Sequence, residues 1–116
     1  MPDPELDPAL LARLVRIGGP TLLGQLIDTF SGDAAARQAA LREAVAARNA
    51  DRAAAAAHAI VAGAGQLGAT ALSDEARDLE QAARAGELTA VAERLPSFLD
   101  RFSRVLAALA AAREPR

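Results

Sequence analysis

Apolar residues recur at spacings of three and four along most of the chain, and this helical period is what most restricts the fold. The run Leu23, Leu26, Ile27, Phe30 and Ala34 illustrates the spacing, which places apolar side chains on one face of a helix. No useful length of sequence alternates with the period of two that is typical of a half-buried strand. Alanine, the best helix former, supplies 32 of the 116 residues. The chain is therefore predicted to be all-α.

Glycine and proline divide this pattern into five predicted helices. Asp7-Pro8 is typical of an N-cap followed by a first helical residue, and Gly18-Gly19-Pro20 ends the short helix that follows. The apolar phase continues across Pro96, which predicts a kink rather than a stop. The predicted helices cover residues 8–17, 20–48, 50–67, 70–85 and 88–112. We expect one domain over residues 1–116, an up-and-down antiparallel four-helix bundle with the short N-terminal helix as a lid.

The rare residue types exclude several kinds of chemistry. The chain has no cysteine, which excludes disulfides, thiolate metal sites and thiol catalysis. Its single histidine, His58, excludes a poly-histidine metal centre, and we expect neither a bound metal nor a cofactor. The net charge is −2 and the arginines are scattered, so nucleic-acid binding is not expected. No ATP-binding motif is found, so we expect no kinase activity of its own.

The chain ends and one long uncharged run bear on localisation. The acidic, proline-rich start MPDPELDP is unlike a signal peptide, so we expect a cytoplasmic protein. Met1 and the polar ends fit a complete small protein, and an excised domain stays open as the alternative. The run Ala53–Ser73 has 21 residues without a formal charge, long enough to span a bilayer. Only four of these are leucine, isoleucine or valine, too few for insertion. We expect no membrane span, and the run needs another explanation.

A helical wheel of residues 50–67 places the histidine on an unusual face. The core stripe consists of Ala53, Ala56, Ala57, Ile60, Ala64 and Leu67. The opposite face has His58 at its centre, surrounded by Ala54, Ala55, Val61, Ala62, Gly65 and Gln66. A solvated helix face is normally rich in charged residues. Two interpretations stay open: a surface filled with a good helix former, or a docking surface that lets a partner reach the imidazole.

Hairpin geometry predicts a partner for this imidazole. If antiparallel helices flank Gly68-Ala69, His58 and Glu80 lie at the same height, because each is eleven residues from Ala69. A carboxylate that accepts Nδ1–H would fix the tautomer and leave Nε2 as a neutral nucleophile. Arg77 and Arg84 share the face of Glu80. A surface ion-pair ladder explains the three charged residues equally well, so both interpretations remain.

The segment Ala57–Ala69, AHAIVAGAGQLGA, resembles the signature of the histidine-containing phosphotransfer (HPt) domain family, approximately A-H-x-L-K-G-x-x-x-x-L-G-A. The similarity extends to the stretch from Leu6 to Phe30 and to the one from Leu79 to Leu88. It implies a phosphorelay carrier in which Nε2 of His58 accepts a phosphoryl group from an aspartyl phosphate and Glu80 orients the ring. The implied partners are receiver domains of a response regulator and of a hybrid histidine kinase. The required Mg²⁺ belongs to the receiver.

Two positions depart from that signature. Val61 stands where the family has lysine, and Ala62 where it has glycine. We predict that Arg77, at the height of Val61, replaces the missing charge, and that the methyl group of Ala62 slows transfer or shifts partner choice. One alternative is a degenerate member that docks receivers without accepting phosphate. Another is an alanine-rich bundle that self-associates through its small-residue face, whereas a relay protein is expected to be a monomer because self-association would bury His58.

Overall fold

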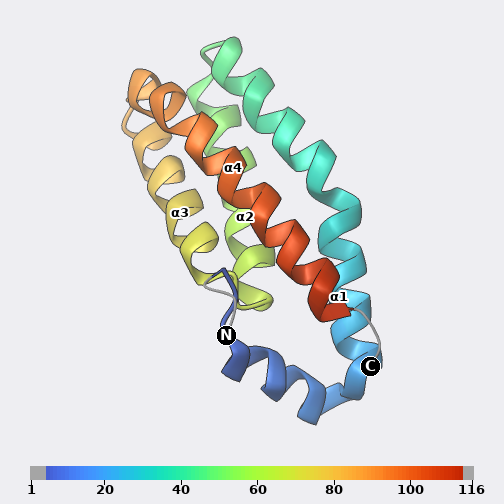
Figure 1. The fold of residues 1–116 in the computed structure, drawn as a ribbon. Helices are drawn as coiled ribbons and strands as arrows, with labels where there is room; N and C mark the ends of the chain where they lie inside the picture. Colours follow the sequence, from blue (N-terminus) through green and yellow to red (C-terminus); the bar gives the residue numbers. More distant parts are fainter. Residues whose placement is uncertain (1–4, 114–116) are drawn as a thin grey trace.

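The computed structural model describes residues 5–113 as four helices that run alternately up and down (Figure 1). They are α1 (Pro8–Ala46), α2 (Ala50–Gln66), α3 (Thr70–Arg84) and α4 (Leu88–Arg113). Each helix packs on the next one along the chain, and α4 returns to pack on α1. No strand occurs between residues 5 and 113. The prediction of an all-α, up-and-down bundle is confirmed, and the helix ends from residue 46 onward lie within two residues of the predicted ones.

The first part of α1 agrees with the expectation of two helical stretches, over 8–17 and 20–48, that meet at a break. The element α1 joins these two stretches across a kink at Gly19, whose φ of 73° and ψ of −178° lie outside the helical region. Glycine adopts positive φ without steric cost, and Pro20 resumes the helix because its ring already holds a helical φ. Helical geometry is therefore interrupted at Gly19, and the predicted break at Gly18-Gly19-Pro20 is confirmed. The segment before the bend lies across the lower end of the bundle, where the lid was predicted (Figure 1).

Side-chain caps begin two of the helices, and the cap at Asp7 is the one predicted above. Asp7 accepts a hydrogen bond of 3.0 Å from the backbone N–H of Ala9. Asn49 accepts one of 3.0 Å from the backbone N–H of Arg52. Each bond satisfies a helix N–H that has no partner within the helix. The last helix, α4, continues through Pro96, so the proline does not stop the helix.

The core combines a few large side chains with many alanines. Its largest fully buried members are Phe98, Phe102, Leu41, Ile60, Leu67, Leu72, Leu79, Leu109, Val91 and Val105. The ring of Phe102 stacks on Phe30 of α1, with 5.5 Å between the ring centroids. On α2, Ala53, Ala57 and Ala64 are buried, and such small side chains let neighbouring helices approach closely. These buried alanines define the face of α2 that packs against the other helices, and the opposite face is the one open to solvent.

The buried carboxylate of Glu5 links the segment just before α1 to α4, and the sequence pattern did not predict this contact. Glu5 is 8% exposed and accepts hydrogen bonds from Arg101 (2.9 Å) and Arg104 (3.1 Å). Arg101 also donates to Glu75 of α3. Two residues later, the backbone N–H of Asp7 donates to the carbonyl of Gly68 at 2.8 Å. The segment before α1 is therefore tied both to α4 and to the turn between α2 and α3.

Among the described helices, α1 is long and apolar enough to cross a membrane by length and composition alone. In the fold, α1 packs on α2 and α4 and contributes Leu23, Ile27, Ala34 and Leu41 to the core. The uncharged run that the sequence analysis singled out forms most of α2, the turn after it and the start of α3. The expectation of no membrane span stays a prediction.

Candidate functional site

His58 lies in the middle of α2 and presents its imidazole to solvent. Its side chain is 68% exposed, whereas the neighbouring Ala57 is fully buried and Ile60 is 1% exposed. The core thus holds the backbone at this point of α2 while the ring stands clear of it. No hydrogen bond engages Nε2 within the part of the chain that the structure describes.

The Nδ1 atom of this imidazole lies 3.1 Å from Oε1 of Glu80, across the α2–α3 hairpin. The contact is at the register that the position of Ala69 predicted. The carboxylate is only 13% exposed, and an ionised carboxylate accepts but does not donate, so Nδ1 is the donor. This arrangement holds the ring in the tautomer that leaves the lone pair on Nε2.

Arg84 donates hydrogen bonds to the second oxygen of the same carboxylate. Its Nε and Nη2 atoms donate to Oε2 of Glu80 at 3.1 and 2.7 Å. The pKa of Glu80 is lowered from its ordinary value of 4.5, chiefly by these hydrogen bonds; burial opposes the shift, and the contact with His58 adds to it. The carboxylate is therefore ionised at neutral pH and bonded on both sides.

Arg77, which we expected to supply a positive charge near His58, is bonded to a carboxylate of its own helix. Its guanidinium donates to Asp74 at 3.2 Å, one turn earlier on α3, and no hydrogen bond joins it to His58 or Glu80 within residues 5–113. The i,i+3 spacing brings the carboxylate of Asp74 within easy reach of Arg77. The structure thus joins His58 to Glu80 and Arg84, and the role of Arg77 as a substitute for the family lysine stays a prediction.

The predicted docking face is narrower than the helical wheel indicated. Ala55, Ala62, Gly65 and Gln66 are exposed, and Val61 is half-buried. Ala54 is only 2% exposed and belongs to the core, so its assignment to this face was wrong. A wheel divides a helix into two halves, but α2 packs against α3 on one flank and α1 on the other. Only a narrow exposed strip therefore remains around His58.

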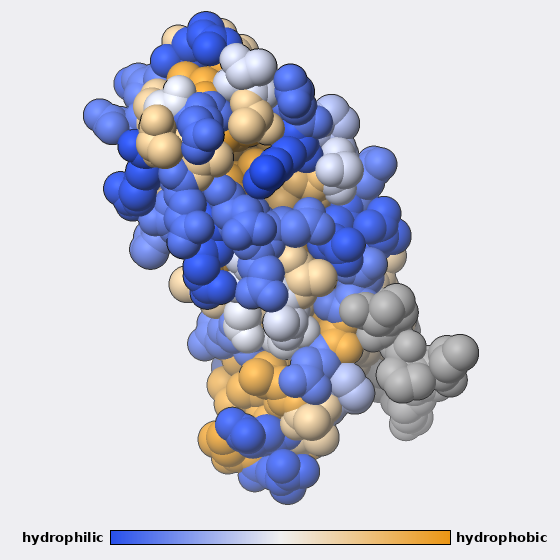
Figure 2. Space-filling model, turned by 90° about the vertical axis from the view of Figure 1, so that its left-hand side faces the viewer, coloured by the Kyte–Doolittle hydropathy of each residue, from blue (hydrophilic) through white to orange (hydrophobic). Residues whose placement is uncertain are grey.

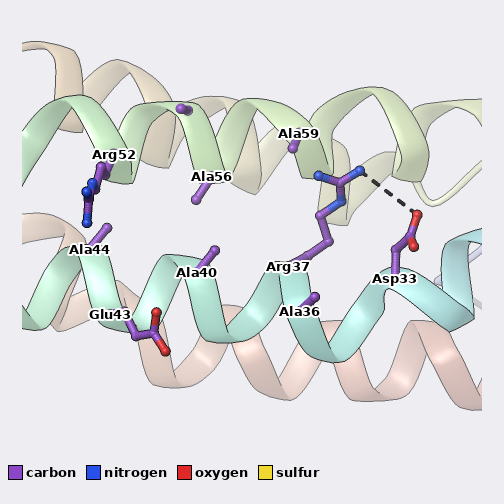
Figure 3. A pocket seen from close by; sticks show the side chains of 10 residues that line it. Asp33, Ala36, Arg37, Ala40, Glu43, Ala44, Arg52, Ala56 and Ala59 are labelled. Carbon is purple, nitrogen blue, oxygen red and sulfur yellow. Dashed lines mark ion pairs between the residues drawn. The ribbon is translucent and has the colours of Figure 1, made fainter.

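Beside this strip runs a groove between α1 and α2 that the sequence analysis missed (Figure 3). Its volume is about 560 Å³, and its walls consist of Ala36, Ala40, Ala44, Ala55, Ala56 and Ala59, with Asp33, Arg37, Glu43 and Arg52 among them. Figure 3 shows the side chain of Arg37 extending from α1 toward α2 near Ala59. The spacing of four between Ala36, Ala40 and Ala44 was the signal that could have revealed the α1 wall.

A second surface that the sequence analysis missed is the apolar start of α1. Val15 is 37% exposed and Ile17 is 71% exposed. Figure 2 shows apolar side chains gathered at the lower end of the molecule, where this segment lies in Figure 1. Among the described residues, no group of three or more histidine, cysteine, aspartate or glutamate side chains is placed to hold a metal ion.

The sequence and the fold of this chain are both similar to those of known proteins. A sequence model described as "Hpt domain" matches residues 25–114. The chain belongs to the Hpt domain family. Its fold is similar to the crystal structure of histidine-containing phosphotransfer protein B (HptB) from Pseudomonas aeruginosa PAO1, with a TM-score of 0.89 and 28% sequence identity. That match covers 97% of this chain and 96% of HptB. A search of curated proteins finds no match.

Family membership confirms the resemblance seen in the segment Ala57–Ala69. Hpt domains are phosphocarriers rather than kinases, and they interact with receiver domains in two-component phosphorelays. This Hpt domain is therefore a histidine phosphotransfer module of such a relay.

Proposed function

We propose that this Hpt domain carries a phosphoryl group on Nε2 of His58, taking it from an aspartyl phosphate on one receiver domain and passing it to another. The observation that supports this most strongly is the exposed imidazole whose Nδ1 is bonded to the ionised carboxylate of Glu80, a side chain that is only 13% exposed. His58 is also the only histidine of the chain. We expect the donor and acceptor to be receiver domains of a hybrid histidine kinase and a response regulator.

In the proposed step, the lone pair of Nε2 forms the new bond to phosphorus. The P–O bond to the receiver aspartate breaks, and its electrons return to the aspartate carboxylate. As positive charge develops on the imidazole, the Glu80 carboxylate at 3.1 Å stabilises the Nδ1–H. Passage to the second receiver reverses these bond changes. The Mg²⁺ ion that the phosphoryl chemistry needs would belong to the receiver, and this chain is expected to bind no cofactor of its own.

The exposed strip of α2 supports docking of a receiver over His58. Ala55, Ala62, Gly65 and Gln66 carry small or uncharged side chains, so a partner's active site meets little steric hindrance there. The groove along α1 adds Arg37 at the edge of this strip. A monomeric protein in the cytoplasm fits this role, because a second copy on the same strip would cover the imidazole.

Val61 and Ala62, the two residues that differ from the family signature, are expected to affect the transfer rate. Val61 is half-buried and carries no charge, so it does not reproduce the family lysine. We propose that Arg77 supplies this charge when a receiver docks, after leaving Asp74, whose side chain is 64% exposed. The methyl group of Ala62 lies on the exposed strip, where it would reduce the space for the incoming receiver.

Incubation with a phosphorylated receiver domain tests the proposed function. Wild-type protein is expected to take up an acid-labile phosphoryl label, and His58→Gln is expected to take up none. Because the imidazole is largely exposed, this substitution leaves the core intact, and circular dichroism serves as the folding control. Stable receiver binding without label in the wild type would contradict the proposal and support the degenerate docking module.

The same preparation tests the self-association alternative. A structural bundle predicts a dimer at micromolar concentration that Ala55→Glu or Ala62→Glu disrupts, because each introduces a charge on the exposed strip. The relay protein predicts a monomer in all three samples. Sedimentation equilibrium distinguishes these outcomes without any receiver domain.

A further inference from the structure

Three side chains form a continuous hydrogen-bonded chain behind the imidazole. His58 contacts Oε1 of Glu80, and Arg84 bonds Oε2 of the same carboxylate through two nitrogen atoms. The middle member is 13% exposed, whereas His58 and Arg84 are 68% and 62% exposed. A largely buried carboxylate thus links two side chains that are mostly in solvent.

The orientation of Glu80 depends on both of its partners. A carboxylate that accepted only the Nδ1–H bond would be free to rotate about its terminal torsion and to exchange its two oxygens. Arg84 removes this freedom, because Nε and Nη2 both bond Oε2 and leave Oε1 toward α2. Charge-assisted bonds of this kind are shorter and stronger than neutral ones.

Two other arginines, one on α3 and one on α4, are bonded to other carboxylates and not to Glu80. Arg77 is bonded to Asp74, and Arg101 is bonded to Glu5 and Glu75. Within residues 5–113, Arg84 is the arginine that bonds Glu80. Loss of Arg84 would leave a carboxylate that is little exposed to water with the imidazole as its remaining side-chain partner.

We propose that Arg84 is a positioning residue that sets the tautomer of His58 through Glu80. It fixes Oε1 against Nδ1, which keeps the proton on Nδ1 and the lone pair on Nε2. Arg84 itself does not contact the imidazole in this arrangement. The inference rests on the proposed role of His58, but the tautomer exists before any phosphoryl group is bound and is measured separately.

The test uses ¹⁵N-labelled histidine and two-bond proton–nitrogen spectra recorded at alkaline pH, which distinguish the two tautomers of the ring. In the wild type, the Nδ1–H tautomer should predominate. In Arg84→Gln, the ratio of Nδ1–H to Nε2–H should fall roughly two- to fivefold. This is the fold-change that corresponds to the interaction free energy of an exposed ion pair. Arg84→Lys, which keeps the charge but not the paired donors, should restore part of the ratio.

Two further variants make the result specific. Arg94→Gln removes the same charge from an exposed position of α4 and should leave the ratio unchanged. Glu80→Ala should shift the ratio at least as far as Arg84→Gln, and adding Arg84→Gln to it should change nothing more, because the arginine acts through the carboxylate. An unchanged ratio in Arg84→Gln, with a shifted one in Glu80→Ala, would overturn the role of Arg84.

Transfer kinetics then separate this inference from the proposed function. With a phosphorylated receiver, Arg84→Gln should slow transfer by the factor by which the fraction of the Nδ1–H tautomer falls, which is smaller than the fall in the ratio because this tautomer predominates in the wild type. A shifted ratio in a protein that never accepts phosphate would refute the proposed function and leave the positioning effect standing. In a phosphate-accepting protein, a transfer rate that does not fall with the measured Nδ1–H fraction across Arg84→Gln and Glu80→Ala would show that the tautomer does not limit transfer and would overturn the functional part of the inference.

Discussion

Gly68, in the turn between α2 and α3, is predicted to tolerate no side chain. Its φ is +75°, and an added Cβ would lie 3.2 Å from the carbonyl oxygen of Asp7 and 3.3 Å from its Cβ and N. Positive φ costs an L-residue about 1–2 kcal/mol. Displacing Asp7 also weakens its 2.8 Å hydrogen bond to the Gly68 carbonyl, a bond worth about 0.5–1.5 kcal/mol. Gly68→Ala should therefore lower the free energy of unfolding by about 1.5–3.5 kcal/mol.

Thermal unfolding followed by far-ultraviolet circular dichroism measures this loss. At the usual unfolding entropy per residue, 1 kcal/mol corresponds to about 4 °C for a chain of this length. The Tm of Gly68→Ala should accordingly fall by about 6–14 °C. A fall of this size identifies the turn as a rigid support for the hairpin that pairs His58 with Glu80.

Gly86, in the next turn, provides the matched control. Its φ is +78°, but nothing lies within 4 Å of an added Cβ. Gly86→Ala should therefore show the backbone strain alone, a fall of about 4–8 °C. Gly68→Ala should be the more damaging substitution because it also displaces Asp7. If the Tm of the two variants falls by the same amount, the packing of Asp7 against Gly68 in the α2–α3 turn does not contribute to stability, and the predicted role of this contact is refuted.

Three further outcomes are expected. Arg77→Ala should slow phosphotransfer and Asp74→Ala should speed it, each by roughly two- to fivefold in a receiver assay, because Asp74 competes for the guanidinium. Glu5→Gln should lower the free energy of unfolding in urea by about 1–3 kcal/mol, since it weakens the buried bonds from α4. The stabilising effect of Glu80 should be present above pH 4.5 and lost as the pH falls below it, because its pKa is lowered in the folded state. Urea titrations of wild type and Glu80→Gln at several pH values should therefore converge on acidification.

Each of these outcomes has a control or a contradicting result. Unchanged rates in both the Arg77 and Asp74 variants would show that Arg77 does not replace the family lysine. Glu93→Gln removes an exposed carboxylate from α4 and should leave stability unchanged. A difference between wild type and Glu80→Gln that stays constant or grows toward low pH would contradict the assigned hydrogen bonds of that carboxylate.

Local patterns predicted the helices and one contact across the hairpin, because both depend on short-range regularities. The apolar period and the caps set the helix bounds, and an antiparallel turn at Gly68 brings His58 to the height of Glu80. A wheel could not reveal that Ala54 is buried, since it contains no information about how many neighbours flank a helix. The contact of Glu5 with Arg101 joins residues 96 positions apart, and no periodicity encodes such a pair.

The identity of the nitrogen that carries the phosphoryl group tests the central claim most directly. Transfer from a phosphorylated receiver to ¹⁵N-histidine-labelled protein, followed by long-range proton–nitrogen NMR, identifies this atom. Because Nδ1 is bonded to Glu80 and Nε2 faces solvent, the phosphoryl group should be found on Nε2 of His58, with the proton still on Nδ1. A phosphoryl group on Nδ1, or a wild-type protein that binds the phosphorylated receiver and stays unlabelled, would contradict the account.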